Sequence, residues 1–381
     1  MDINELRSRV DALDADLLRL IAQRLALAEE INAAKAKQGL PLLDEARETA
    51  MIRAARETAA KPLTADDAED ALRAILNLSR RWVYGRSAAA RAEPRRIAII
   101  GLGLIGGSLA RALKRGNPRH AIRGVDLSER LEQPAASGLF ESVHQPGDGA
   151  RAVAEAEVVF LCVPPKRALE VLEALARDLP RDAVLTDVGG LKLEIVERAE
   201  ALGFGKAGPV FVGGHPMAGR ELTGFEASRA DLFTDRNWVL TPRPDAALPP
   251  LTLLRGLVES TGAYVQLLSP EEHDRVVVTV SHLPQLVSIA LTLTVAGRDR
   301  GIGGPALKEM TRLASSPAAL WNELLAEVRP QAVGELQRMR SYLTELEIAL
   351  SFREPLDKWF DQAANLRRGI STGQPWYGAG E

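Results

Sequence analysis

The sequence predicts a multidomain protein of mixed α and α/β class, with a central doubly wound parallel sheet between two all-helical regions. At 381 residues the chain exceeds the size at which one hydrophobic core stays favourable, so two or three domains are expected. Residues 1–84 are rich in Ala and Leu and almost free of Gly and Pro. From Arg96 short apolar runs alternate with helical segments, which is typical of a parallel α/β sheet.

Four segments follow from these changes of composition. We expect a helical domain at residues 1–85, a linker at 86–95, an α/β domain at 96–268 and a helical substrate and dimerisation domain at 269–381. Helical periodicity returns at about Ser269 and continues almost to the Gly-rich tail.

Composition excludes several classes of partner. The net charge of -3 gives no reason to expect nucleic acid or an anionic membrane. The N-terminus lacks a basic region followed by an apolar run, and we expect no stretch long enough to span a bilayer. Cys162 is the only cysteine and lies in an apolar run, so we expect an inert packing thiol and no metal site. A single thiol without an internal disulfide fits a reducing cytoplasm.

The first region resolves into three helices. A second helix begins near Asp44 and ends at about Ala60, and Thr64 with Asp67 forms a capping-box start for a third helix that reaches about Tyr84. Three such helices cannot close a core alone, which predicts an intertwined dimer. The first helix, at residues 4–38, carries apolar side chains at nearly heptad spacing, and these are Leu6, Leu13, Leu17, Leu20, Leu27 and Ile31.

Basic residues of these helices indicate a binding site for a small anion. On an ideal helix Arg24 and Lys35 lie about 20° apart around the axis and about 16 Å along it, so their side chains can converge. Arg7 lies about 26 Å from Arg24, which places it better to serve the site of an antiparallel partner. Side chains at the start of the second helix that are neighbours on its surface are Asp44, Arg47 and Glu48.

These positions, together with Ser79, resemble the all-helical chorismate mutase family in order and spacing over the whole first region. The resemblance implies that Arg7 of one subunit joins Arg24 and Arg47 in holding the two carboxylates of chorismate. Asp44 and Ser79 belong to the same implied substrate-binding set.

The implied chemistry of this site is electrostatic and conformational, because a pericyclic rearrangement needs no covalent or acid–base step. By resemblance, Lys35 donates to the ether oxygen whose bond breaks, and Glu48 holds the ring hydroxyl. One position departs from the family. Val83 stands where the family commonly has a Gln or Glu that also hydrogen-bonds the ether oxygen, so we expect Lys35 to carry most of that role.

The second region opens with a strand, a glycine-rich turn and a helix. The turn Gly101–Gly106 has the spacing that lets a pyrophosphate approach a helix N-terminus, which predicts a Rossmann-like dinucleotide-binding domain. Asp126 follows the next strand, where a carboxylate binds the ribose 2′-hydroxyl and favours NAD over NADP. The expected cofactor-binding residues are Gly101, Gly103, Leu104, Ile105, Gly106, Asp126, Val163 and Pro164.

A second set of polar residues follows the later strands. His215 lies in Gly213-Gly-His-Pro-Met-Ala-Gly219, after an apolar strand, where a histidine is poorly placed for packing and well placed for chemistry. The polar residues further along are His273, His282, Gln285 and Arg312. This series resembles the prephenate/arogenate dehydrogenase family over essentially all of residues 96–360.

The resemblance implies a role for each of these residues. His215 accepts, or hydrogen-bonds, the proton of the substrate 4-hydroxyl while hydride leaves the same carbon for NAD. The resulting ketone drives loss of the ring carboxylate, and Arg312 clamps a substrate carboxylate. The residues implied to line the pocket are His273, His282 and Gln285, and Trp321 either walls the site or packs in its helix. Relatives usually carry Ser at the position of Gly190, and the resemblance implies that this hydroxyl hydrogen-bonds the catalytic histidine and the substrate. Because Gly190 lacks that donor, we expect a slower enzyme, not an inactive one.

Three interpretations remain open at this point. The chain is a fusion that converts chorismate to prephenate and then, with NAD, to 4-hydroxyphenylpyruvate for tyrosine biosynthesis. Alternatively, a dehydrogenase for prephenate or arogenate retains an inactive mutase-like segment for dimerisation or tyrosine sensing, as Val83 suggests. A 6-phosphogluconate-type or hydroxyacid dehydrogenase is a third interpretation, against which the run around His215 argues, because those enzymes are expected to use a lysine base. In each case we expect small-molecule substrates and a homodimer held at both ends of the chain.

Overall fold

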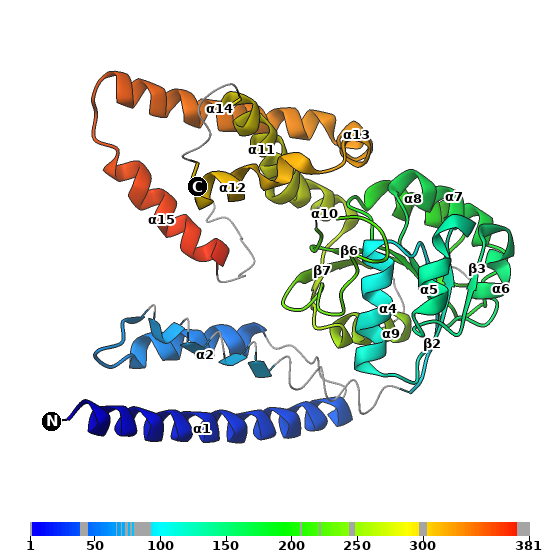
Figure 1. Cartoon of the computed structure of the whole chain (residues 1–381), viewed down its shortest axis with the longest axis horizontal. Coiled ribbons are helices and arrows are strands. Elements are labelled where there is room, and N and C mark those ends of the chain that lie inside the picture. Colours follow the sequence, from blue (N-terminus) through cyan, green and yellow to red (C-terminus); the bar gives the residue numbers. More distant parts are fainter. Residues whose placement is uncertain are drawn as a thin grey trace. The chain divides into compact units, whose positions relative to one another are not determined.

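The computed structural model describes residues 2–38, 45–65, 67–69, 71–72, 75–76, 78–79, 93–205, 208–220, 222–243, 248–296 and 303–371. The chain forms two compact units, one made of Met1–Ser87 with Tyr342–Glu381 and the other of Ala88–Ser341 (Figure 1). The proposed boundary between residues 268 and 269 stays a prediction, because the second unit spans it.

The unit Ala88–Ser341 contains one eight-stranded sheet with the order β3-β2-β1-β4-β5-β6-β7-β8. The first six strands run parallel, β7 is antiparallel to β6, and β8 is parallel to β7. The order reverses between β1 and β4, where ligands bind in doubly wound sheets, and the predicted fold class is confirmed. The strands are β1 (Arg96–Ile100), β2 (Ala121–Val125), β3 (Ser142–His144), β4 (Val158–Leu161), β5 (Val184–Asp187), β6 (Val210–Pro216), β7 (Asn237–Thr241) and β8 (Tyr264–Leu267).

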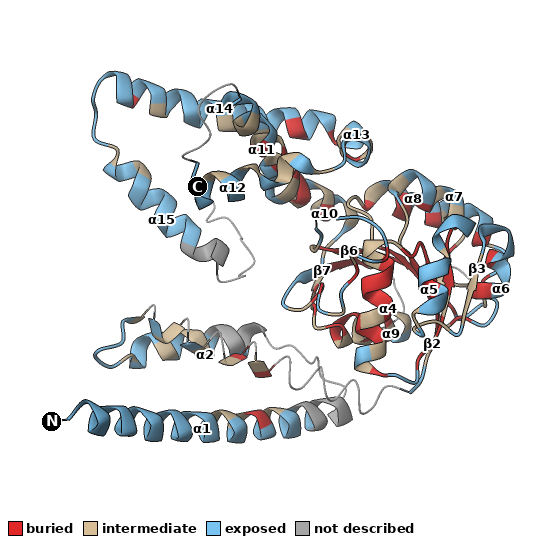
Figure 2. Ribbon diagram, in the orientation of Figure 1, coloured by how far each residue is buried: buried red, intermediate tan, exposed pale blue. Residues whose placement is uncertain are grey.

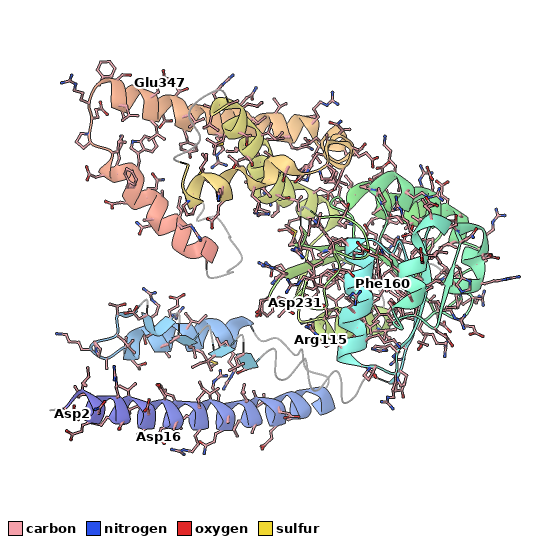
Figure 3. All side chains as sticks on the ribbon, in the orientation of Figure 1. Asp2, Asp16, Arg115, Phe160, Asp231 and Glu347 are labelled. Atoms are coloured by element: carbon pink, nitrogen blue, oxygen red, sulfur yellow. The ribbon has the colours of Figure 1, made fainter. Side chains whose placement is uncertain are left out.

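Helices cover both faces of this sheet, because the side chains of a buried strand alternate between the two faces. Ile97 and Ile99 face a core that includes α4 and α9, and Ala98 and Ile100 face the opposite core with α6, α7 and α8. Figure 2 shows the buried residues concentrated in the strands and in α4, and Phe160, labelled in Figure 3, belongs to the first core. The helices are α4 (Leu104–Gly116), α5 (Glu132–Ala136), α6 (Gly149–Val153), α7 (Pro165–Leu175), α8 (Leu193–Ala201) and α9 (Leu248–Ser260), with 3₁₀ turns at Ser128–Arg130 and Pro146–Asp148.

A helical region follows the sheet, as the periodicity after Ser269 predicts. A small third core of Val278, Val328 and Ala332 holds part of it together. Its elements are α10 (Pro270–Val277), a π-helical turn (Val278–His282), α11 (Leu283–Thr294), α12 (Pro305–Thr311), a 3₁₀ turn (Arg312–Ser315), α13 (Ala318–Glu327) and α14 (Arg329–Ser351).

The helical run Pro270–Thr294 corrects one expectation from the sequence. By length and composition alone it could cross a membrane, with a mean hydropathy of 1.7 in its most apolar stretch. Charged residues at the start of the run, Glu271, Glu272, Asp274 and Arg275, interrupt its apolar pattern in the sequence. Three polar residues within it, His273, His282 and Gln285, are buried in the unit. One side of this helical run therefore packs in the interior of the protein.

The described residues of the unit that contains the N-terminus form helices joined by turns and include no strand. It includes α1 (Ile3–Gln38), α2 (Glu45–Thr58) and α15 (Asp357–Ser371), and the described residues between Ala65 and Ser79 are helical as well. The predicted capping box is confirmed, because the Asp67 amide donates to Thr64 Oγ1 at 3.1 Å and the Thr64 amide donates to Asp67 Oδ2 at 2.9 Å.

The long helix α1 leaves its predicted apolar stripe uncovered. Figure 2 shows α1 exposed along most of its described length. A contiguous apolar face of this kind is what an intertwined dimer would cover. The stripe residues, each between 43% and 64% exposed, are Leu6, Leu13, Leu17, Leu20, Leu27 and Ile31.

Candidate active site

Asp187 organises the carboxyl ends of β5 and β6. It is buried as the last residue of β5. Its Oδ1 accepts from the Gly214 amide at 3.0 Å, and its Oδ2 accepts from the Gly189 amide at 2.8 Å and from Lys192 Nζ. Burial lowers the pKa of Lys192, and the Asp187 carboxylate opposes that shift. The ion pair therefore fixes the backbone next to His215 to the end of the neighbouring strand.

His215 lies near the end of β6, opposite Val239 of β7, and is only partly buried. Its Nδ1 lies 2.8 Å from Nε2 of His273, and the two rings meet edge to face with centroids 5.1 Å apart. Burial lowers the pKa of His215 well below its usual value, and His273, Lys192 and His282 lower it further. The imidazole is therefore neutral at neutral pH, as a proton acceptor must be.

His273 and Asp274 extend this contact to the start of α8. His273 is fully buried in α10, a helix capped by Ser269, whose Oγ accepts from the Glu272 amide at 3.1 Å. His273 Nδ1 lies 2.7 Å from Oδ1 of Asp274. The Asp274 carboxylate also accepts from the backbone amides of Lys192 at 2.8 Å and Leu193 at 2.9 Å. The groups form one continuous series from the first turn of α8 to His215.

The π-helical turn places His282 in the same helical run as His273. His282 is buried, and its ring meets Trp321 edge to face at 5.4 Å. Burial lowers the pKa of His282 to about 4, with Asp274 opposing the shift and His273 adding to it. Among the described residues its Nδ1 has no hydrogen-bond partner although it is buried. A buried polar atom without a partner costs free energy unless a ligand or water binds it. The unpartnered Nδ1 therefore supports the prediction that His282 lines a substrate pocket.

Gln285 and Arg312 lie where α11 packs against the 3₁₀ turn Arg312–Ser315. Gln285 is buried and its Nε2 donates to the Leu313 carbonyl at 2.8 Å, while Ser316 Oγ donates to its Oε1 at 3.4 Å. Arg312 is exposed at the start of the 3₁₀ turn, next to Leu313. The proposed carboxylate clamp at Arg312 stays a prediction.

Gly190 has a structural explanation. A Cβ at this position would lie 3.1 Å from Cδ2 and 3.4 Å from Cδ1 of Leu324, a buried residue of α13. A serine there would require Leu324 to move. Position 190 supplies no hydroxyl in this chain, and the described hydrogen-bond partner of the His215 ring is His273.

The glycine-rich turn between β1 and α4 fits a dinucleotide. Gly101 has a φ of +96°, and a Cβ there would lie 2.4 Å from the Cys162 carbonyl oxygen; a Cβ at Gly106 would lie 1.9 Å from the Gly101 carbonyl oxygen. At Gly103 nothing lies within 4 Å of the Cβ position, and no side chain caps the start of α4, whose first turn contains Leu104 and Ile105. The first amides of α4 are thus available to a pyrophosphate.

Asp126 is held rigidly beside this turn. Its Oδ2 accepts from the Leu102 amide and its Oδ1 from the Leu127 amide, both at 2.7 Å. It lines a hollow with residues of α7, among them Arg167 and Glu170. This carboxylate fits a ribose hydroxyl at the carboxyl edge of β2. The other two predicted contacts, Val163 and Pro164, follow β4 at the same edge.

Cys162 and the two remaining histidines have structural positions. Cys162 follows β4 and packs against the first core, and burial raises the pKa of its thiol, which disfavours the nucleophilic thiolate. His120, which received no role from the sequence, is buried and its Nδ1 accepts from the Arg95 amide at 3.0 Å. His144 is the last residue of β3, with Nε2 2.8 Å from Ser142 Oγ.

The helical unit brings only part of its predicted site together. Arg24 of α1 donates to Ser79 Oγ, which donates in turn to the Ile75 carbonyl at 2.8 Å. Arg7 is exposed and seventeen positions earlier in α1, about 26 Å from Arg24. Arg47 is exposed on α2. Asp44 and Val83 lie outside the described residues, as do the side chains of Lys35 and Glu48.

Three contributors to the dehydrogenase-like site received no role from the sequence: Asp187, Lys192 and Asp274. Each had a signal. Asp187 is a charged residue at the end of an apolar strand, Lys192 follows the Gly189-Gly190 turn, and Asp274 adjoins His273. A carboxylate or lysine beside a functional loop indicates a positioning group, but only three-dimensional contacts identify its partner.

Three family models match successive parts of the chain. Residues 6–83 match chorismate mutase type II, residues 109–267 match the nucleotide-binding domain of prephenate dehydrogenase, and residues 269–373 match the dimerization domain of prephenate dehydrogenase.

Individual relatives agree with these matches. A prephenate dehydrogenase of Bacillus subtilis is 30% identical over 73% of this chain and 76% of its own length. A cyclohexadienyl dehydrogenase of Zymomonas mobilis is 32% identical over 72% of this chain and 96% of its own. The crystal structure of an Aquifex aeolicus prephenate dehydrogenase with hydroxyphenyl propionate and NAD+ has a TM-score of 0.66 at 28% identity, covering 74% of this chain and 99% of that one.

Proposed function

The chain belongs to the prephenate dehydrogenase family, and from that premise we propose how its residues divide two reactions. It is a bifunctional enzyme of tyrosine biosynthesis, because a chorismate mutase segment precedes the dehydrogenase. The first reaction rearranges chorismate to prephenate. The second converts prephenate to 4-hydroxyphenylpyruvate by NAD-dependent oxidative decarboxylation.

His215 carries the dehydrogenase proposal. Its ring is neutral, partly exposed and at the same sheet edge as the Gly101–Gly106 turn. The Gly101–Gly106 turn and Asp126 would hold NAD, which would supply the acceptor for the hydride that leaves the ring carbon of prephenate. His215 takes the proton of the 4-hydroxyl on that carbon through the ring nitrogen that does not face His273. Arg312 holds a substrate carboxylate, with His282 and Gln285 in the pocket wall.

Arg24 carries the mutase proposal, because Ser79 holds its guanidinium in place. Arg24 and Arg47 bind the chorismate carboxylates together with Arg7 of a second copy, and Lys35 and Glu48 act on the ether oxygen and the ring hydroxyl. The protein is a homodimer, as its dimerization domain indicates, and the uncovered stripe of α1 is the surface we propose for pairing the mutase segments.

Paired assays on the purified full chain test both assignments. One follows chorismate loss without cofactor, and the other follows NADH appearance with NAD and prephenate, then with arogenate. We expect activity in both assays, with prephenate preferred over arogenate. NADH formation without chorismate loss would contradict the mutase half and attribute its loss to Val83, whereas faster turnover of arogenate would overturn the substrate assignment.

Tyrosine is the effector that we propose for this enzyme, because it is the amino acid made from the dehydrogenase product. Adding tyrosine to the NADH assay is expected to lower the rate at fixed prephenate. A rate unchanged at saturating tyrosine would contradict this proposal and would leave the two catalytic assignments untouched.

We propose a cytoplasmic location for the enzyme. NAD-dependent biosynthesis and the lone Cys162 fit a reducing compartment. The apolar run Pro270–Thr294 carries buried polar residues of the dehydrogenase site, so its exposed apolar side is better suited to the dimer. Recovery of the activity in the membrane pellet after cell fractionation would contradict this location.

A further inference from the structure

The neighbours of Asp274 determine where one proton lies. A carboxylate only accepts hydrogen bonds. The Lys192 and Leu193 amides, which can only donate, take Oδ1 and Oδ2 respectively, at 2.8 and 2.9 Å. The third neighbour, His273 Nδ1 at 2.7 Å from Oδ1, must therefore also donate, so His273 carries a proton on Nδ1.

This proton fixes the roles of the next two nitrogens. A neutral imidazole with its proton on Nδ1 has a lone pair on Nε2. His273 Nε2 lies 2.8 Å from His215 Nδ1, so the hydrogen bond between them forms when His215 donates. His215 then carries its proton on Nδ1 and presents the lone pair of Nε2 away from His273.

We infer that Asp274 and His273 are positioning residues that fix the tautomer of His215, so that Nε2 is the atom that takes the substrate hydroxyl proton. This inference rests on the proposed dehydrogenase function. It also explains how the enzyme works with Gly190. The hydrogen bond from His215 Nδ1 to His273 orients the ring in place of a hydroxyl at position 190. Both ring nitrogens of His273 are engaged, Nε2 with His215 and Nδ1 with Asp274, so His273 acts through His215.

The same series accommodates the charge that the reaction creates. When His215 gains a proton on Nε2, its Nδ1 proton can pass to His273 Nε2, while His273 keeps its own proton on Nδ1 and donates it to Asp274 Oδ1. One proton enters, one moves along the series, and the positive charge then lies on the ring that contacts the carboxylate. The charged or titratable groups around His215 are His273 and Asp274 from α10, His282 from the π-helical turn, Lys192 before α8 and Asp187 from β5.

Direct observation of the tautomer tests the inference without relying on turnover. The chain has five histidines, so nitrogen-15 labelling of histidine gives few side-chain signals, which His→Asn variants assign one at a time. We expect His215 and His273 of the free full-length enzyme to carry their protons on Nδ1 at neutral pH. A His215 signal with the proton on Nε2 would overturn the inference, even in an enzyme that forms NADH from prephenate.

Two substitutions of Asp274 separate orientation from charge. Asp274→Asn keeps an oxygen at the Oδ1 position, which two donors share, so the tautomer is expected to remain while the charge is lost. Asp274→Ala removes both. We expect kcat to fall by about a hundredfold in Asp274→Ala, within the range of general acid–base catalysis, and less in Asp274→Asn, with KM for prephenate and NAD unchanged in both.

The pH profile supplies the readout that a purely structural role would not change. Removing the carboxylate disfavours the protonated histidine pair, so the acid limb of kcat/KM is expected to move to lower pH in both variants. Glu271→Gln, which removes an exposed carboxylate from the same helix, is the control and should leave kcat and the pH profile unchanged. Equal rates for Asp274→Ala and the wild type, or an unmoved acid limb, would overturn the inference.

Discussion

The two catalytic parts of the chain differ in how much of their structure one copy completes. The sheet of the dehydrogenase part buries both of its faces with its own helices, and Asp187, Lys192, Asp274 and His273 organise the site from within. The helix α1 instead exposes its apolar stripe, and Arg7 does not reach Arg24 along the same helix. The structure of one chain shows the contacts of the dehydrogenase site residue by residue. For a mutase site shared between two copies, one chain shows only the exposed surfaces that a second copy would cover.

The largest expected effect is on the internally completed part. Lys192→Met leaves the buried Asp187 carboxylate without its partner, which costs about 3–5 kcal/mol. Urea unfolding of the dehydrogenase part, followed by tryptophan fluorescence, measures the loss. Arg198→Met removes the half-exposed ion pair with Glu173 and should cost less than about 1 kcal/mol. Similar losses in the two variants would show that the buried pair does not organise this region.

A change in the α1 stripe is expected to affect the two activities differently. Leu17→Glu removes an apolar contact worth about 2–3 kcal/mol and places a charge in the proposed dimer contact. Chorismate turnover should fall sharply while NADH formation from prephenate persists. Ala15→Glu introduces the same charge on the opposite face of the helix and should spare both activities. Unchanged chorismate turnover in Leu17→Glu would remove the basis for a shared mutase site.

Two glycines of the cofactor turn should separate stability from binding. Gly101→Ala places a Cβ against the Cys162 carbonyl at a positive φ, which costs about 1–3 kcal/mol and lowers the Tm. Gly103→Ala meets no atom of the protein within 4 Å, so its Tm should stay near the wild-type value while KM for NAD rises. A raised KM without loss of Tm in Gly101→Ala would contradict the steric account.

The smallest expected effect concerns Gly190. Gly190→Ser alone crowds Leu324 and is expected to change kcat by less than about tenfold, because the new hydroxyl and the displaced leucine oppose each other. Gly190→Ser with Leu324→Ala removes the side chain that crowds the new hydroxyl. Kinetics of the single and double variants measure the coupling, and a double variant no faster than Leu324→Ala alone would show that His273 already supplies the orientation.

The sequence predicted the fold well wherever local pattern and global structure agree. Apolar runs ending at the turn Gly101–Gly106 and at Asp126 predict the parallel sheet, because buried parallel strands are continuous apolar segments. The sequence also selected His215 from its Gly-rich surroundings. It could not predict the contact between the His215 and His273 rings, since these residues are 58 positions apart in the sequence. It likewise could not predict that Leu324 occupies the space beside Gly190, because packing between distant helices leaves no local signal.

The central claim is that one chain holds two independent sites, and two single substitutions assayed for both reactions test it most directly. His215→Asn should abolish NADH formation from prephenate and leave chorismate loss at the wild-type rate. Arg24→Ala should do the reverse. Loss of both activities from either substitution, in a protein whose circular dichroism and Tm match the wild type, would contradict the claim and indicate a single coupled site.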